Sequence, residues 1–142
     1  MALTPERRHC GEMITTSTAT QGHVLVVASG SLGADIIAWL SSMGQRARLV
    51  ADFLCAKHEV DTHPPQLLVT QLKLGAFNGL HLVARARGRG LTSPAIVVGD
   101  ADCVLADEAR QLEARYLVTP LNEDTFLDTA LTLLHHAASA SR

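Results

Sequence analysis

Residues 28–33, Ala-Ser-Gly-Ser-Leu-Gly, have the types and spacing of a phosphate-binding loop. They lie between an apolar, β-branched run and a segment of helical periodicity, which is the setting of the dinucleotide-binding fingerprint. The first glycine of that fingerprint is replaced by Ala28, whereas Gly30 and Gly33 are present. Asp52 follows the next apolar run, where a carboxylate would contact the ribose of a nucleotide. One hypothesis is therefore a small-ligand or nucleotide-binding module, and its alternative is that the two glycines only relax the loop and allow close helix packing.

Charged residues cluster at two further places in the chain. An acidic group follows a later apolar run and consists of Asp100, Asp102, Asp107 and Glu108. Acidic side chains are favourable at a helix N-terminus, so we expect this group to begin a solvated helix rather than to bind a metal. A basic group ends another helical segment and consists of Arg85, Arg87 and Arg89. It lacks interleaved aromatic residues, so we expect a solvated face and not a nucleic-acid site.

The remaining reactive side chains form no catalytic or metal-binding pattern. His135 and His136 are adjacent in a helical segment, so their side chains point in different directions. The hydroxyl groups nearest the expected loops, those of Ser29, Ser31 and Thr70, have no histidine or acid positioned to activate them. The three cysteines, Cys10, Cys55 and Cys103, contain no Cys-x-x-Cys pair and are expected to be small buried hydrophobes. We therefore expect no disulfide, no metal site and no enzymatic activity.

Length and composition indicate one globular domain. The chain has 142 residues, 47% of them hydrophobic and 18% charged, with a formal net charge of −2. This charge gives no reason to expect a nucleic-acid or membrane partner, and the apolar runs are shorter than the roughly 20 residues of a membrane helix. The polar residues 1–22 are expected to form a flexible tail, with Met13 as an alternative start, followed by a domain over residues 23–137 and a tail over 138–142. No secretory signal pattern is present, so we expect a cytoplasmic protein.

Five short apolar runs alternate with segments of helical period. The expected strands cover residues 24–28, 48–51, 67–71, 95–99 and 116–118. The expected helices cover residues 31–43, 51–59, 80–87, 101–113 and a last segment from Asn122, with Ser31 and Asn122 as N-caps. Strict alternation with short loops predicts an α/β fold in which helices cover both faces of a parallel sheet.

Three segments resemble one known family. Residues 65–80 (PQLLVTQLKLGAFNGL) resemble the third strand and following loop of response-regulator receiver domains. Residues 94–99 (PAIVVG) resemble the fourth strand, and residues 116–121 (YLVTPL) resemble the fifth strand and its turn. The resemblance implies a flavodoxin-like, doubly wound (βα)5 fold with strand order 2-1-3-4-5. It also implies a stand-alone receiver-like domain in phosphorelay-type, two-component signal transduction.

The positions that carry the chemistry of this family are all replaced. The resemblance implies an acidic pair after the first strand and a nucleophilic aspartate ending the third, which hold Mg²⁺ through their oxygens. The five signature positions align here with Ala28, Ser29, Gln71, Gly99 and Thr119. No Asp or Glu occurs within residues 13–34 or 62–99, so no shift of the alignment restores the carboxylates. We therefore predict a degenerate phosphorylation pocket that binds no Mg²⁺ and accepts no phosphoryl group.

Tyr116 aligns with the switch aromatic of the family. We expect it to pack at a strand edge with its hydroxyl group reaching solvent. The resemblance places partner and dimer contacts on the face formed by helix four, strand five and helix five. The candidate interface residues on this face are Val104, Leu105, Glu108, Arg115, Tyr116 and Glu123. We accordingly expect a protein partner, or a homodimer, to use this face.

Overall fold

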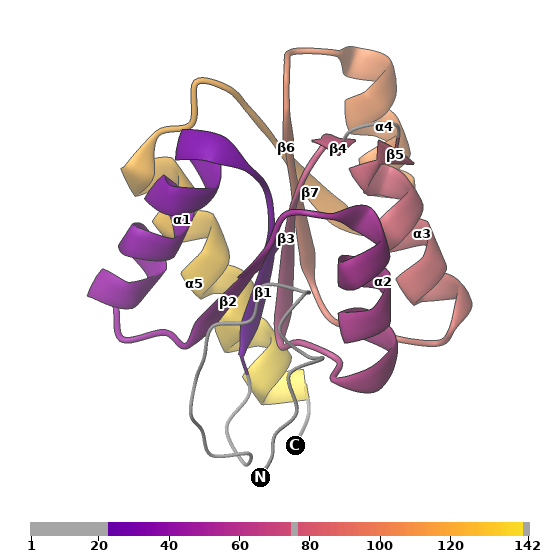
Figure 1. The fold of residues 1–142 in the computed structure, drawn as a ribbon, viewed down its shortest axis with the longest axis horizontal. Helices are drawn as coiled ribbons and strands as arrows, with labels where there is room; N and C mark the ends of the chain where they lie inside the picture. The colour runs from indigo at the N-terminus through magenta and orange to yellow at the C-terminus, as the bar shows by residue number, and fades with distance from the viewer. Residues whose placement is uncertain (1–22, 75–76, 141–142) are drawn as a thin grey trace, which may run out of the picture.

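The computed structural model describes residues 23–74 and 77–140, and its centre is a sheet of five parallel strands. The strands are β1 (Val24–Val27), β2 (Ala47–Val50), β3 (Leu67–Gln71), β6 (Ala95–Gly99) and β7 (Ala114–Val118). Their order in the sheet is β2-β1-β3-β6-β7, and all carboxyl ends point upward in Figure 1. Because β6 and β7 are the fourth and fifth strands of this sheet, the predicted order 2-1-3-4-5 is confirmed.

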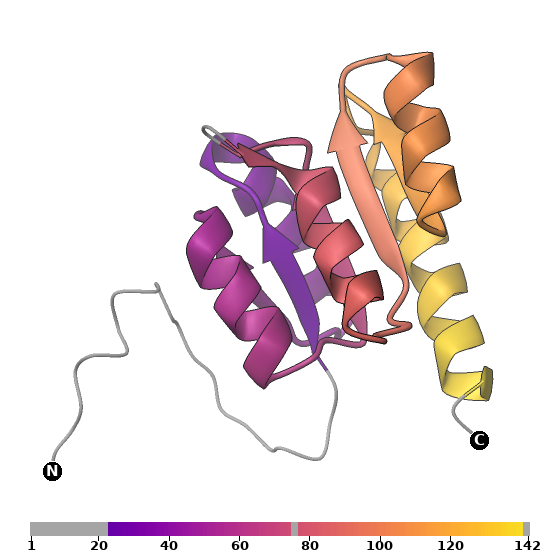
Figure 2. The same cartoon turned by 90° about the vertical axis from the view of Figure 1, so that its right-hand side faces the viewer.

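Helices cover both faces of this sheet. On one face lie α1 (Gly30–Ser42) and α5 (Glu123–Ala140), at the left of Figure 1. On the other lie α2 (Phe53–Thr62), α3 (Gly79–Gly88) and α4 (Cys103–Gln111), which Figure 2 shows side by side. The helix α5 continues three residues past the predicted domain end at 137. The predicted tail over residues 1–22 lies outside the described residues, as do positions 141–142.

Alternating side chains of the strands build two separate cores. In β1, Leu25 and Val27 face the α2, α3 and α4 layer, and both are fully buried. Val24 and Val26 face the α1 and α5 layer, where they pack with Phe126. A strand alternates its side chains between faces, and a run that is apolar on both faces is typical of a central parallel strand. The alternation therefore places the crossover helices on both sides of the sheet.

Helix boundaries differ from the predictions where an acidic side chain acts as the N-cap. The helices α2 and α4 begin two residues later than expected, because Asp52 and Asp102 occupy the N-cap positions. One Asp102 carboxylate oxygen accepts from the main-chain N–H groups of Val104 and Leu105 at 3.0 and 3.1 Å. The prediction that Ser31 caps the first helix is wrong, because α1 already begins at Gly30. Asn122 does cap the last helix, as predicted.

In the basic group at the end of α3, Arg87 departs from the solvated face that we expected, whereas Arg85 and Arg89 remain largely at the surface. Arg87 points into the lower end of the molecule, where its guanidinium donates to the carbonyl oxygens of Leu91, Ser93 and Leu112 at 3.1, 2.8 and 2.8 Å. Burial lowers the pKa of Arg87, but the group stays protonated at any neutral pH. Arg85 and Arg89 pair with Asp61 at 2.9 and 3.1 Å. Arg87 thus connects several main-chain segments, whereas the surface pairs of Arg85 and Arg89 contribute little to stability.

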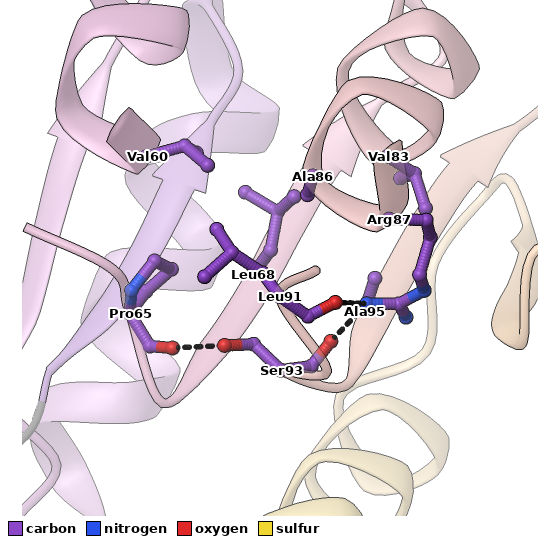
Figure 3. A pocket seen from close by; sticks show the side chains of 9 residues that line it. All are labelled: Val60, Pro65, Leu68, Val83, Ala86, Arg87, Leu91, Ser93 and Ala95. Carbon is purple, nitrogen blue, oxygen red and sulfur yellow. Dashed lines mark hydrogen bonds between the residues drawn. The ribbon is translucent and has the colours of Figure 1, made fainter. Parts of the chain in front are cut away.

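A small cavity lies beside Arg87, below the start of β3 (Figure 3). Its volume is about 10 Å³, which is the size of one water molecule. The lining residues come from α2, α3 and the amino ends of two strands: Val60, Pro65, Leu68, Val83, Ala86, Arg87, Leu91, Ser93 and Ala95. The Ser93 hydroxyl donates to the carbonyl oxygen of Pro65 at 2.6 Å. This cavity is too small for a ligand. It lies at the end of the sheet opposite the loops that follow the carboxyl ends of the strands.

Two of the three cysteines lie within the residues that the structure describes. Cys55 is half-buried and Cys103 is exposed. The expectation of a buried hydrophobe is therefore wrong for Cys103, which is the first residue of α4. Cys10 lies outside the described residues.

Candidate functional site

The candidate site is the upper edge of the sheet, where the loops after β1, β3, β6 and β7 meet (Figure 1). In an open parallel α/β sheet, ligands bind outside the carboxyl ends of the strands. The sheet register brings the ends of β1 and β3 side by side and does the same for β3 and β6. Of the five predicted pocket residues, Ser29, Gln71, Gly99 and Thr119 therefore gather at one edge.

Ala28, the fifth predicted pocket residue, does not lie in the crevice at this edge. It is only 1% exposed, and its methyl group packs into the α1 and α5 core with Ile36 and Val98. Position 28, where we expected a residue of the crevice, is therefore part of the hydrophobic core. A carboxylate placed there would lose its hydration without gaining a cationic partner.

Gln71 is tied to the loop after β1. Its side-chain Oε1 accepts a hydrogen bond from the main-chain N–H of Ser29 at 3.1 Å. This contact joins the end of β3 to the start of α1 across two neighbouring strands. The amide therefore bridges two loops directly, at the position where the resemblance implies a cation held by carboxylates.

Thr119 and Asp100 form a second bridge. The Thr119 hydroxyl donates to a carboxylate oxygen of Asp100 at 3.2 Å, and the Thr119 N–H donates to the carbonyl oxygen of Gly99 at 2.9 Å. These bonds join the loop after β7 to the loop after β6. Asp100 is consequently paired with a neutral neighbour, and the resemblance implies a lysine at the position of Thr119.

The hydroxyl of the half-buried Tyr116 is engaged in a hydrogen bond within the protein. It donates to the carbonyl oxygen of Asp100, and the ring packs against the core under α4. A Cβ atom built on Gly99 would lie 2.7 Å from this hydroxyl oxygen. Burial raises the pKa of Tyr116, and the carboxylates of Asp102 and Asp100 raise it further. The hydroxyl therefore stays protonated and acts as a donor throughout the physiological range.

A short antiparallel hairpin, which the sequence analysis missed, holds the loop after β3. It consists of β4 (Lys73–Leu74) and β5 (Phe77–Asn78). Phe77 stacks on Phe53 of α2, with ring centroids 4.6 Å apart and planes inclined by 11°. Asn78 caps α3 by accepting from the N–H of Leu80 at 2.7 Å. The stacked pair and the cap fix the path of the chain directly after Gln71.

Gly79 lets α3 start close to the end of β3. A Cβ atom at this position would lie 2.3 Å from the carbonyl oxygen of Gln71 and 2.8 Å from the hydroxyl oxygen of Thr70. Only glycine permits such an approach of the main chain. The tight contact holds Gln71 in place from the side opposite Ser29.

The donor set at this edge does not fit a divalent cation. Mg²⁺ prefers charged oxygen ligands in octahedral geometry, and Gln71, Ser29 and Thr119 are neutral. The carboxylate at this edge, that of Asp100, accepts from the Thr119 hydroxyl, and those of Asp52 and Asp102 cap helices. Within residues 23–74 and 77–140, no group of three His, Cys, Asp or Glu side chains could hold a metal ion.

The glycines of the loop after β1 serve packing. A Cβ atom on Gly33 would lie 3.1 Å from a methyl carbon of Leu49 and 3.2 Å from the carbonyl oxygen of Ala28. Gly30 has a φ of +66°, which glycine adopts without strain. The N–H of Ser29 at this turn is already bonded to Gln71. The geometry therefore favours the packing explanation over the nucleotide-binding hypothesis.

The candidate interface residues lie around β7. α4 packs against β7, and on it Val104 is 68% exposed, Leu105 is half-buried and Glu108 is exposed. Arg115 is exposed on β7 itself, which is an edge strand of the sheet. Glu123 is exposed at the start of α5, in the opposite helix layer. Apart from the half-buried Leu105 and Tyr116, these side chains are open to solvent.

Solved structures with the same fold are numerous, although no protein-family model and no curated protein matches the sequence. The signal receiver domain of a Luxo repressor protein from Vibrio parahaemolyticus superimposes with a TM-score of 0.79 at 21% identity, over 84% of this chain and 95% of that one. The chemotaxis protein CheY4 from Vibrio cholerae gives 0.71 at 20% identity, over 79% and 98%. A CheY-like receiver domain protein from Methanospirillum hungatei gives 0.74 at 18%, over 84% and 98%.

These three neighbours share the architecture described above. The matches span almost the whole length of each neighbour, so they compare complete domains. None of the described helices is long and apolar enough to cross a membrane. The chain has the fold of a response-regulator receiver domain.

Proposed function

We propose that this chain is a receiver-like signalling module that acts by binding another protein and is not switched by phosphorylation. The observation that carries the proposal is the hydrogen bond from the Ser29 N–H to the Gln71 side chain. A carboxamide is a poor nucleophile and cannot form an acyl phosphate. Its oxygen is also engaged with the main chain. Gln71, at the expected phosphorylation position, therefore connects two loops of the fold.

The electrostatics of the upper edge support the same proposal. A phosphoryl group brings nearly two negative charges and needs cations or several N–H donors around it. The nearby charged groups Asp100 and Asp102 are acidic, and Thr119 stands where the resemblance implies a lysine. Repulsion by these carboxylates would oppose an incoming phosphate. We propose accordingly that the module binds no Mg²⁺ and has no enzymatic activity.

The partner surface in this proposal is the edge formed by α4 and β7. Val104 and Val118 are large apolar side chains that are 68% and 46% exposed there. Arg115 and Glu108 add charges of both signs nearby. Apolar residues surrounded by charges are typical of a protein-binding surface. A homodimer through this edge is the second form of the same proposal.

The test of this function is exposure to a small-molecule phosphodonor. Incubation with acetyl phosphate or phosphoramidate and Mg²⁺ should leave the intact mass of the protein unchanged, because no carboxylate stands at position 71. A receiver domain with the complete acidic set serves as the positive control in the same buffer. A stoichiometric phosphoryl adduct that maps to the loops after β3 or β6 would overturn the proposal.

A further inference from the structure

We propose that Gly99 and Tyr116 form a latch that holds the loop after β6 and the start of α4 in one arrangement without any ligand. This inference rests on the proposed function and deepens it, because it names the part of the fold that replaces a ligand. The two residues lie on neighbouring strands, with Gly99 paired to Val118 and Tyr116 paired to Val97. The register brings the phenol of Tyr116 alongside the end of β6.

The missing side chain at position 99 makes room for the hydroxyl. A Cβ atom there would lie 2.7 Å from the Tyr116 hydroxyl oxygen, and 2.9 and 3.0 Å from the Cβ and Cδ2 atoms of Leu72. Separations below 3.0 Å require movement of one partner. Leu72 is only 5% exposed and its Cβ is fixed by the main chain, whereas the phenol can rotate. A side chain at position 99 therefore displaces the phenol of Tyr116, and its contact with Leu72 is relieved by a small shift of the main chain.

The hydroxyl anchors the loop at its first residue. It donates to the carbonyl oxygen of Asp100, and Thr119 donates to the side chain of the same residue. Two residues further on, Asp102 caps α4 through the N–H groups of Val104 and Leu105. The three contacts run continuously from β7 to the first turn of α4. Closure of the latch thus fixes the position of the exposed Val104 on the proposed partner surface.

The pKa of Tyr116 agrees with this geometry. Burial, together with the carboxylates of Asp102 and Asp100, raises it above the ordinary value of a phenol. A raised phenol pKa means that the folded state favours the neutral donor, so this contribution is complete at neutral pH and is lost as the pH rises past the ordinary value near 10. Tyr116 is the only tyrosine in the chain, so its ionisation can be followed by ultraviolet absorbance alone.

Substitution of Gly99 tests the latch. In Gly99→Ala, we expect the pKa of Tyr116 to fall toward its ordinary value and the amide NMR signals of Asp102, Val104 and Leu105 to shift. Tyr116→Phe removes only the hydroxyl and adds no volume, so it should move the same amide signals even if Gly99→Ala folds poorly. Loss of one hydrogen bond should speed amide exchange at Val104 and Leu105 roughly two- to tenfold in both variants. Gly88→Ala is the matched control, because a Cβ atom at Gly88 meets nothing within 4 Å.

The outcomes separate the latch from the proposed function. Shifts at the start of α4 in both latch variants, and none in Gly88→Ala, support the latch. Unchanged amide signals and exchange rates in Tyr116→Phe, together with an unchanged Tyr116 pKa in Gly99→Ala, would overturn it. The phosphodonor incubation is run on the same native sample. A phosphoryl adduct on the native protein would overturn the proposed function, whatever the latch variants show. If no adduct forms and the amide signals of the latch variants are unchanged, the latch alone is overturned.

Discussion

Replacing Arg87 by methionine should lower the free energy of unfolding by about 3 kcal/mol. The guanidinium donates to four main-chain carbonyl groups, those of Leu91, Ser93, Leu112 and Glu113. Each carbonyl group becomes unpaired or must recruit water when the guanidinium is removed. Hydrogen bonds from a charged group contribute about 1.5–3 kcal/mol each, so four full contributions would exceed the predicted loss. Arg87 is only partly buried, so water can replace some of these bonds, and the predicted loss corresponds to about two of them at the lower end of this range. Urea denaturation at pH 7 measures the change through the transition midpoint at constant slope.

Arg110→Met is the matched control for this variant. Arg110 is also on a helix, but its side chain is 71% exposed and pairs only with Asp107 in the next turn. Exposed pairs of this kind contribute at most about 1 kcal/mol. Equal losses of stability in the two variants would show that the carbonyl contacts of Arg87 contribute no more to the free energy of unfolding than an exposed ion pair does.

The double variant Ser29→Asp, Gln71→Asp should acquire a stability that depends on Mg²⁺. The main-chain nitrogen of residue 29 and the side-chain oxygen of residue 71 are 3.1 Å apart, so the two new carboxylates would stand on adjacent loops at the same edge of the sheet. Two unit charges about 5 Å apart repel by about 3 kcal/mol at an effective dielectric constant of about 20. We therefore expect a lower Tm in chelator and recovery as Mg²⁺ is added. Each tenfold excess over Kd contributes about 1.4 kcal/mol.

The single variants separate the causes of this effect. Ser29→Asp introduces a good N-cap residue at the start of α1 and should be nearly neutral on its own. Gln71→Asp loses the bond to the Ser29 N–H and should cost about 1 kcal/mol without a response to Mg²⁺. A double variant whose Tm ignores Mg²⁺ would show that positions 29 and 71 cannot form a cation site on this chain.

The sheet was predictable because its three central strands are almost fully buried. A central parallel strand reads as a short continuous apolar run, and β1, β3 and β6 each do so. The gathering of Ser29, Gln71, Gly99 and Thr119 at one edge followed from the same reasoning. Strand ends in a parallel sheet meet at one edge whatever their side chains are.

The polar contacts at that edge were not predictable, because each depends on a neighbour that is distant in sequence. Gln71 bonds to a residue 42 positions away, and Arg87 bonds to carbonyl groups of a loop 25 positions away. The β4 and β5 hairpin has strands of two residues, which are too short to show a period. The sequence did contain one indication of the position of Tyr116. Gly99 has no side chain at the end of the strand beside Tyr116, which is what a buried phenol there requires.

The most direct test of the account is a titration of the native, isotopically labelled protein with Mg²⁺ and then beryllofluoride. Amide NMR follows Ser29, Gln71 and Gly99, and fluorescence follows Trp39, the only tryptophan of the chain. Since internal hydrogen bonds engage the polar groups of the upper edge, we predict no saturable change at these three amides or at the Tyr116 ring. Saturable shifts at Gln71 and Gly99 would contradict the account, because they would require a working phosphate-like site at the end of β3.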